Sequence, residues 1–167
     1  MTISTSRRAR VRASAAVAVG AAVLLTGCGQ SDVAAKVGDR VISENAARVA
    51  AEQIRANFDA DTFGTPEAVR SLISAPLIIA AGEKAGMPFS VEAAKAAFAK
   101  TSDPSPEAIE LLRANYVASQ MQGQPALSEV SAELLKSKIV INPRYGTWDA
   151  KTADIVDSAP NWLKATS

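Results

Sequence analysis

Residues 34–43 read Ala-Ala-Lys-Val-Gly-Asp-Arg-Val-Ile-Ser, and they decide how the domain begins. The Gly-Asp pair is a turn signal between two runs that carry β-branched residues, which predicts a tight hairpin with strands at about 35–37 and 40–42. Ser43 then supplies the side-chain oxygen of a helix N-cap. The apolar residues that follow recur with the period of one helix face, so a first helix is predicted over about 43–58.

A second stretch with strand character lies far along the chain, at residues 138–142 (Lys-Ile-Val-Ile-Asn). Its β-branched residues favour a strand. Because a short isolated β element is unstable in water, the economical arrangement pairs the strand region 36–42 with 138–142. The sequence therefore predicts a mainly α domain of four to five helices. A small two-stranded β element is expected to close it by joining the N- and C-terminal ends of the domain.

The helices between these strands are predicted from capping residues and apolar periodicity. The second helix begins with Thr65 as its N-cap, carries the most apolar stripe of the domain, and ends at Gly86. Pro76 lies inside this helix and is expected to kink or divide it. The remaining helices are predicted at about 90–100 and 105–122, which begin at Ser90 and Ser105, and at about 127–137, after a stop at Gly123 and Pro125.

The stretch Leu25-Thr26-Gly27-Cys28 resembles a bacterial lipobox. In lipoproteins with this motif a diacylglyceryl group is attached to the cysteine sulfur, and a peptidase cleaves just before the cysteine. Four arginines precede the apolar run 13–25, which has the length of a signal peptide and is shorter than the ~20 residues of a membrane span. Cys28 is also the only cysteine, so it has no disulfide partner in this chain. A plain secretory signal with a chance cysteine and an uncleaved anchor are the alternatives.

The lipobox divides the chain into a signal peptide (1–27), a lipidated tether (28–33), the helical domain (34–149) and a loosely ordered C-terminal tail (150–167). The signal contains four arginines and no acid, so the rest of the chain has 14 basic and 17 acidic residues. This charge argues against a nucleic-acid partner and against electrostatic binding to anionic lipid. The protein is therefore expected on the extracytoplasmic face of the cell membrane, held in the bilayer through acylated Cys28.

The residue types that are missing limit the chemistry. The chain has no histidine and one cysteine, which excludes zinc sites of the Cys/His kind and Ser-His-Asp or Cys-His nucleophiles. No glycine-rich phosphate loop is present, and no metal, cofactor or catalytic residue is expected. Arg144 and Tyr145 are interpreted as parts of a turn after the last strand. An enzyme that relies on carboxylates is the least favoured class, because no pair of acids has a suggestive spacing.

Three landmarks behind the lipobox resemble the SurA N-terminal domain family. They are the strand, turn and Ser-capped helix at 35–43, the helix end Glu-Lys-Ala-Gly-Met-Pro-Phe-Ser at 83–90, and the closing Ile-Val-Ile-Asn-Pro-Arg-Tyr-Gly-Thr-Trp-Asp at 139–149. The resemblance covers roughly 34–149. It implies a relative of the PrsA/SurA-type foldases, which are extracytoplasmic folding helpers that often carry a parvulin-type prolyl isomerase domain. The landmarks leave no room for that domain and its usual histidines are absent, so isomerase activity is not expected.

Two classes of function follow. The first is a non-catalytic chaperone that binds unfolded or secreted polypeptides along an apolar groove. The second is a structural or adaptor lipoprotein that holds one dedicated envelope or secretion partner. Met87, Met121, Trp148 and Trp162 have side chains that suit promiscuous contacts. The first three are interpreted as core or turn-packing residues, and both interpretations stay open for Trp162. No individual client-binding residue is predicted.

Overall fold

A computed structural model describes residues 32–156, and this part of the chain begins with the predicted hairpin. β1 (Val33–Val37) and β2 (Arg40–Ser43) pair antiparallel, with Val37 opposite Arg40. Gly38 has a φ of +57° in the turn, a left-handed conformation that glycine adopts without a steric penalty. The Gly-Asp turn predicted from the sequence is thus confirmed.

The closing strand β3 (Ile139–Ile141) pairs antiparallel with β1, as expected for a sheet that joins the two ends of the domain. The prediction of a two-stranded element is wrong in number, because β1 uses both of its edges and the order is β2-β1-β3. Asn142 extends the junction: its backbone N–H donates to the carbonyl oxygen of Ala34 at 2.9 Å. Its side-chain amide donates to the carbonyl oxygen of Val33 at 3.2 Å.

Five α-helices lie between β1–β2 and β3, all within the described residues. Three of them begin at the predicted N-caps, where the serine side chain accepts the backbone N–H three residues later. This satisfies one of the free donors at each helix start. The helices are α1 (Glu44–Phe58), α2 (Thr65–Lys84), α3 (Val91–Ala96), α4 (Pro106–Gln120) and α5 (Pro125–Lys136).

Three predicted boundaries differ from the structure. The N-cap of α2 is Gly64 instead of Thr65, because the Glu67 carboxylate accepts the Gly64 N–H at 2.9 Å and caps the helix from inside. Pro125 begins α5 where a stop was predicted, since a residue without an N–H fits the first helical turn. α3 ends at Ala96, about one turn before the predicted end.

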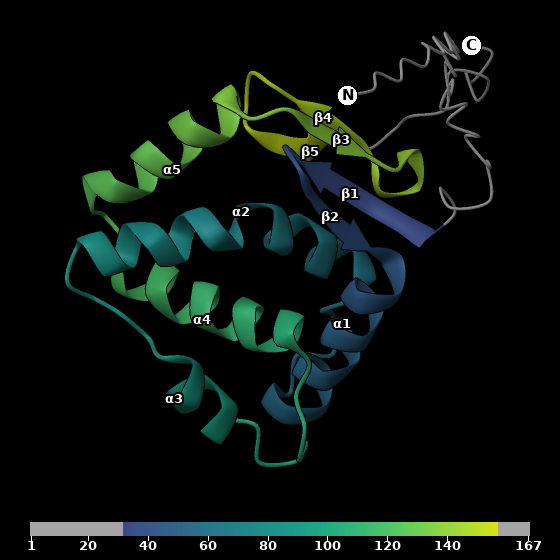
Figure 1. Cartoon of the computed structure of the whole chain (residues 1–167), viewed down its shortest axis with the longest axis vertical. Coiled ribbons are helices and arrows are strands. Elements are labelled where there is room, and N and C mark those ends of the chain that lie inside the picture. The colour runs from purple at the N-terminus through teal and green to yellow at the C-terminus, as the bar shows by residue number, and fades with distance from the viewer. Residues whose placement is uncertain (1–31, 157–167) are drawn as a thin grey trace, which may run out of the picture.

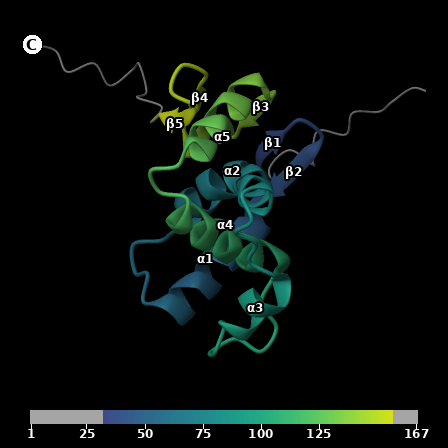
Figure 2. The same ribbon diagram turned by 90° about the vertical axis from the view of Figure 1, so that its left-hand side faces the viewer.

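α2 lies at the centre of the helical layer and packs against α1, α4 and α5. The strands and α5 lie at one end of the molecule, α2 and α4 cross the middle, and α3 lies at the other end (Figures 1 and 2). Val69 and Leu72 of α2 and Val117 and Met121 of the α4 region are the largest fully buried side chains. No polar or charged side chain of the described residues is buried, so the core is held together by apolar packing.

α2 runs as one helix through Pro76, so of the two predicted effects of the proline, a kink or a division, the division does not occur. Proline lacks the N–H that would bond to the carbonyl oxygen four residues earlier, which is that of Leu72. Arg40 of β2 takes the place of this donor, with its Nη1 3.2 Å from the Leu72 oxygen. The same guanidinium makes a two-pronged pair with Glu110 of α4, at 2.9 and 2.6 Å. Arg40 therefore ties the hairpin to α2 and α4 at the point where α2 lacks a backbone bond.

A second small sheet follows β3, in a region whose sequence has no clear periodicity. A 3-10 turn, η2 (Pro143–Tyr145), leads into β4 (Thr147–Asp149), which pairs antiparallel with β5 (Asp154–Val156). The prediction of a loosely ordered tail over 150–167 is wrong for residues 154–156. They form a strand because Ile155 is buried in the main core opposite Trp148. Residues 157–167 lie outside the described part of the chain.

Candidate functional site

The lipidation motif lies outside the described residues. Leu25, Thr26, Gly27 and Cys28 all precede residue 32, where the description of the structure starts. Within 32–156, no helix is both long and apolar enough to cross a membrane.

Of the four methionine and tryptophan residues considered for client binding, the three that the structure describes do not form one surface. Met121 is fully buried between the helices, so it is a core residue, as interpreted from the sequence. Met87 is partly buried beside Gln124, whose side-chain amide lies 3.8 Å from its sulfur. Trp148 packs against the main core from β4. Trp162 lies beyond the described residues.

An apolar groove, which we call the helical groove, lies between α1, α2 and α4. It has a volume of about 420 Å³, within the range usual for ligand sites. Its lining is mostly aliphatic and aromatic, with small polar residues on α2 and α4 (Ser71, Ser74 and Asn115) and no charged side chain. The larger apolar contributions are from Ile54, Phe58, Phe63, Ile78, Leu111 and Leu112.

The local sequence explains the shape of the helical groove. α1 ends at Phe58, and Asp59 takes a left-handed conformation that turns the chain back toward α2. Phe58 is fixed by an edge-to-face contact with Phe98, with ring centroids 5.1 Å apart. On α2 the groove is lined by Ser71 and Ser74, one turn apart on the same face. Because small side chains stand where large ones would fill the space, a hollow remains between the three helices.

The two serines do not make the helical groove polar. The Ser74 hydroxyl donates to the Ser71 carbonyl oxygen at 3.2 Å, so its hydrogen is already used within α2. No buried side-chain nitrogen or oxygen in residues 32–156 lacks a hydrogen-bond partner. An apolar ligand can therefore bind in the groove without leaving a buried polar atom of the protein unpaired.

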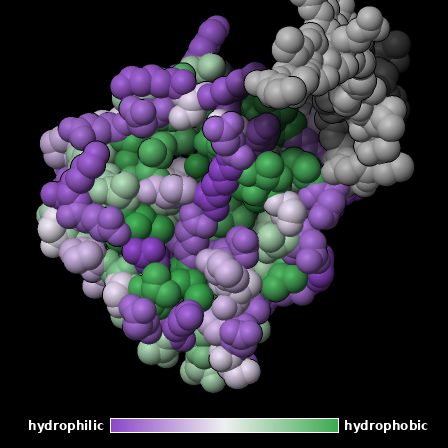
Figure 3. Space-filling model, in the orientation of Figure 1, coloured by the Kyte–Doolittle hydropathy of each residue, from purple (hydrophilic) through white to green (hydrophobic). Residues whose placement is uncertain are grey.

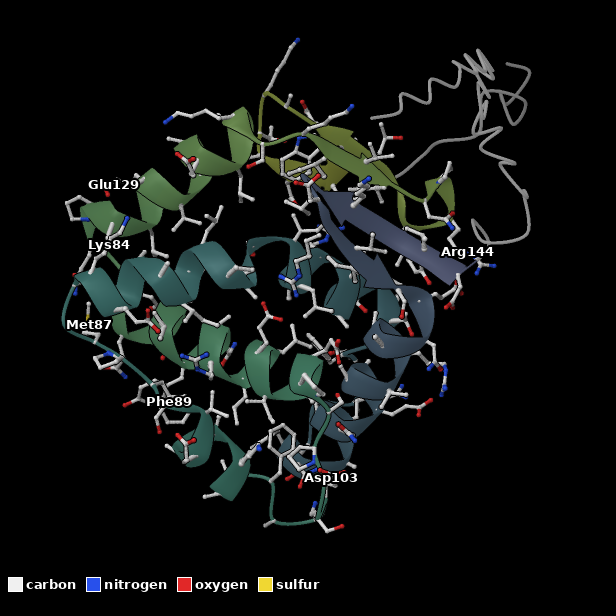
Figure 4. The ribbon with its side chains drawn as sticks, viewed as in Figure 1. Lys84, Met87, Phe89, Asp103, Glu129 and Arg144 are labelled. Atoms are coloured by element: carbon white, nitrogen blue, oxygen red, sulfur yellow. The ribbon has the colours of Figure 1, made fainter. Side chains whose placement is uncertain are left out.

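Other hollows on the described surface are bordered by charged side chains. One of about 370 Å³, between α2 and α5, is bordered by Lys84, Glu129 and Glu133, and Figure 4 shows Lys84 and Glu129 close to each other on these two helices. A wider one of about 780 Å³, between α2, α3 and α4, has five charged residues in its lining. On the face seen in Figure 3, hydrophobic side chains form separate patches with hydrophilic ones between them. The helical groove therefore differs from these hollows in having an uncharged lining.

Arg144 and Tyr145 form a structural turn, as interpreted from the sequence. The Arg144 backbone N–H donates to the Asn142 side chain at 3.2 Å, and the Arg144 guanidinium pairs with Glu44 at the start of α1. Burial raises the pKa of Tyr145, and the charge of Glu44 and a hydrogen bond to it raise this pKa further, against an opposing effect of Arg144. The phenol thus stays protonated and donates to Glu44. No group of three or more acidic, Cys or His residues within 32–156 is placed to hold a metal ion.

No protein-family model, curated protein or solved structure matches the chain. The resemblance to the SurA N-terminal domain family therefore rests on the three sequence landmarks, with no support from these comparisons.

The residues of the helical groove were not singled out from the sequence. Two signals in the sequence could have indicated these groove residues. Phe58 and Phe63 border a short polar loop, and Ser71 and Ser74 interrupt one face of an otherwise apolar helix. Each signal is ordinary in isolation, and only the packing of α4 against α1 and α2 brings them together.

Proposed function

We propose that the protein is an extracytoplasmic lipoprotein, held on the cell membrane through acylated Cys28, that acts as a non-catalytic chaperone for unfolded or secreted polypeptides. On this proposal the chain is a SurA N-terminal-like domain without an isomerase domain. The helical groove receives exposed apolar side chains of the client.

The observation that most supports this proposal is the uncharged lining of the helical groove. Burial of one client leucine or phenylalanine contributes about 1.5–3 kcal/mol, which corresponds to weak binding in isolation. Weak binding that depends on apolar area and on few directed hydrogen bonds suits a holdase, because many client sequences supply such side chains. The aromatic rings of Phe58 and Phe63 add contact area of the same unselective kind.

Suppression of aggregation by soluble residues 29–167 tests the proposal. Two or more unrelated unfolded proteins would be diluted into increasing amounts of the chain while light scattering is followed. The wild-type chain is expected to suppress most of them near equimolar ratio. Ala118→Gln and Ser71→Gln put larger polar side chains into the groove, and each is expected to weaken binding roughly tenfold, as for the loss of one buried apolar side chain.

Ala132→Gln is the matched control, since Ala132 is an exposed alanine of α5 outside the helical groove. It is expected to leave suppression unchanged. Suppression that is equally strong in all variants would exclude the groove as the client site. If no unfolded protein is protected, the general holdase is excluded and the adaptor function, with one dedicated envelope or secretion partner, replaces it.

A further inference from the structure

The proposed lipid anchor limits how far one part of the domain is from the membrane. β1 begins at Val33, five residues after Cys28. Since an extended chain spans at most about 3.3–3.6 Å per residue, the start of β1 lies no more than roughly 18 Å from the acylated cysteine. This restriction follows from the covalent chain, so it does not depend on client binding.

The residues around the start of β1 form one end of the molecule, which we call the tethered pole. Val33 is paired with Ser43, the N-cap of α1, and its carbonyl oxygen accepts the Asn142 side-chain amide. Glu44, the next residue of α1, pairs with Arg144 of η2. Hydrogen bonds and an ion pair thus fix the first turn of α1 and the η2 turn to the anchored strand.

α1 and α2 lead away from the tethered pole (Figure 1). α1 has 15 residues and is therefore about 22 Å long, which places Phe58 at its far end. Figure 4 shows Arg144 on one side of the molecule and Lys84 and Met87 on the opposite side, at the far end of α2. The helical groove lies between these helices, with Phe58 part of its lining.

We propose that the tethered pole faces the bilayer, so that Phe58 in the lining of the helical groove and the far end of α2 lie away from the bilayer, on the side of the aqueous extracytoplasmic space. Client segments then reach the Phe58 end of the groove from water. Arg144 at the tethered pole is paired with Glu44, and the chain after the signal peptide has more acidic than basic residues. The orientation should therefore be the same on zwitterionic and on anionic membranes. This inference rests on the lipid anchor of the proposed function but not on chaperone activity.

Quenching of a fluorophore by lipid head groups tests the orientation in the acylated protein (residues 28–167), reconstituted into phosphatidylcholine vesicles. Cys28 is the only cysteine, and acylation consumes its thiol, so one introduced cysteine is the only free thiol. Arg144→Cys places the label at the tethered pole and Lys84→Cys at the opposite side. Each change removes one basic residue that is exposed, so the two variants are matched in charge.

With nitroxide groups on the lipid head groups, the label at position 144 is expected to be quenched several-fold more than the label at position 84. The difference should persist when anionic lipid is added. Equal quenching at both positions, or stronger quenching at position 84, would overturn the orientation while leaving the lipid anchor intact. If the protein fails to float with the vesicles, the lipid anchor is wrong and the orientation falls with it, whereas chaperone activity is tested separately with soluble residues 29–167.

Discussion

Replacement of Arg40 by methionine is expected to destabilise the fold far more than the loss of an ordinary surface ion pair. The Arg40 guanidinium bonds to the Leu72 carbonyl oxygen, which Pro76 leaves without its helical partner, and to both carboxylate oxygens of Glu110. The two side chains of the ion pair are 33% and 22% exposed. Methionine keeps much of the apolar stem of arginine but none of its donors.

The magnitude follows from these distances and exposures. Hydrogen bonds to charged groups contribute about 1.5–3 kcal/mol when partly protected from water, whereas exposed ion pairs contribute about 0–1 kcal/mol. With two short bonds to Glu110 and one longer bond to Leu72, Arg40→Met should lower the free energy of unfolding by about 2 kcal/mol. For a domain of this size that corresponds to a fall in Tm of roughly 6–10 °C.

A double-mutant cycle with Pro76→Ala isolates the bond to Leu72. Alanine restores the backbone N–H at position 76, so Leu72 regains its helical donor and the cost of Arg40→Met should fall by about 1 kcal/mol. Urea denaturation followed by circular dichroism measures all four proteins. Arg48→Met, which removes an exposed pair with Glu52, is the control and should cost about 0.5 kcal/mol or less. The reasoning is refuted if Arg40→Met costs no more than this control, or if Pro76→Ala leaves its cost unchanged.

The remaining predictions concern packing, pH and the anchor. Gly82→Ala should destabilise the domain by about 1–3 kcal/mol in a thermal melt, because the new Cβ would overlap Val117 of α4. A rise in Tm, as the higher helix propensity of alanine alone would give, would contradict this. The raised pKa of Tyr145 stabilises the fold below about pH 10, and this contribution is lost as the pH rises through the folded-state value. Tyr145→Phe should therefore reduce the loss of Tm above pH 10, and an unchanged profile would exclude this role. Cys28→Ser should move the protein from the membrane fraction to the soluble fraction in cells; unchanged membrane association would point to another anchor.

Much of the fold could be predicted because its signals are local. The hairpin turn at Gly38 and the caps at Ser43, Ser90 and Ser105 depend on residues within a few positions of each other. The end of α2 was equally clear: Gly86 has a φ of +75°, and the Met87 N–H bonds back to Gly82 at 2.8 Å, the pattern of a glycine-terminated helix. The pairing of β1 with β3 could be inferred because few stretches of the sequence have strand character and a short strand needs a partner to be stable.

The missed features depend on contacts between distant residues. β4 and β5 have three residues each, too few to show periodicity, and their stability depends on Ile155 reaching the core. The role of Arg40 required knowing that Leu72 and Glu110 lie beside it, 32 and 70 residues along the chain. The helical groove is likewise a product of packing between three helices, and none of its residues belongs to a motif.

Photocrosslinking from the helical groove is the most direct test of the proposed chaperone function. A benzophenone amino acid would replace Asn115, an exposed residue of the groove lining, and, as the control, Ala132 on α5. The acylated protein in vesicles would be irradiated with several defined, unrelated unfolded polypeptides. Crosslinks to most of these polypeptides from position 115, and few from position 132, are predicted. Equal yields at both positions, or no crosslink from position 115, would contradict the proposal that this groove holds unfolded clients.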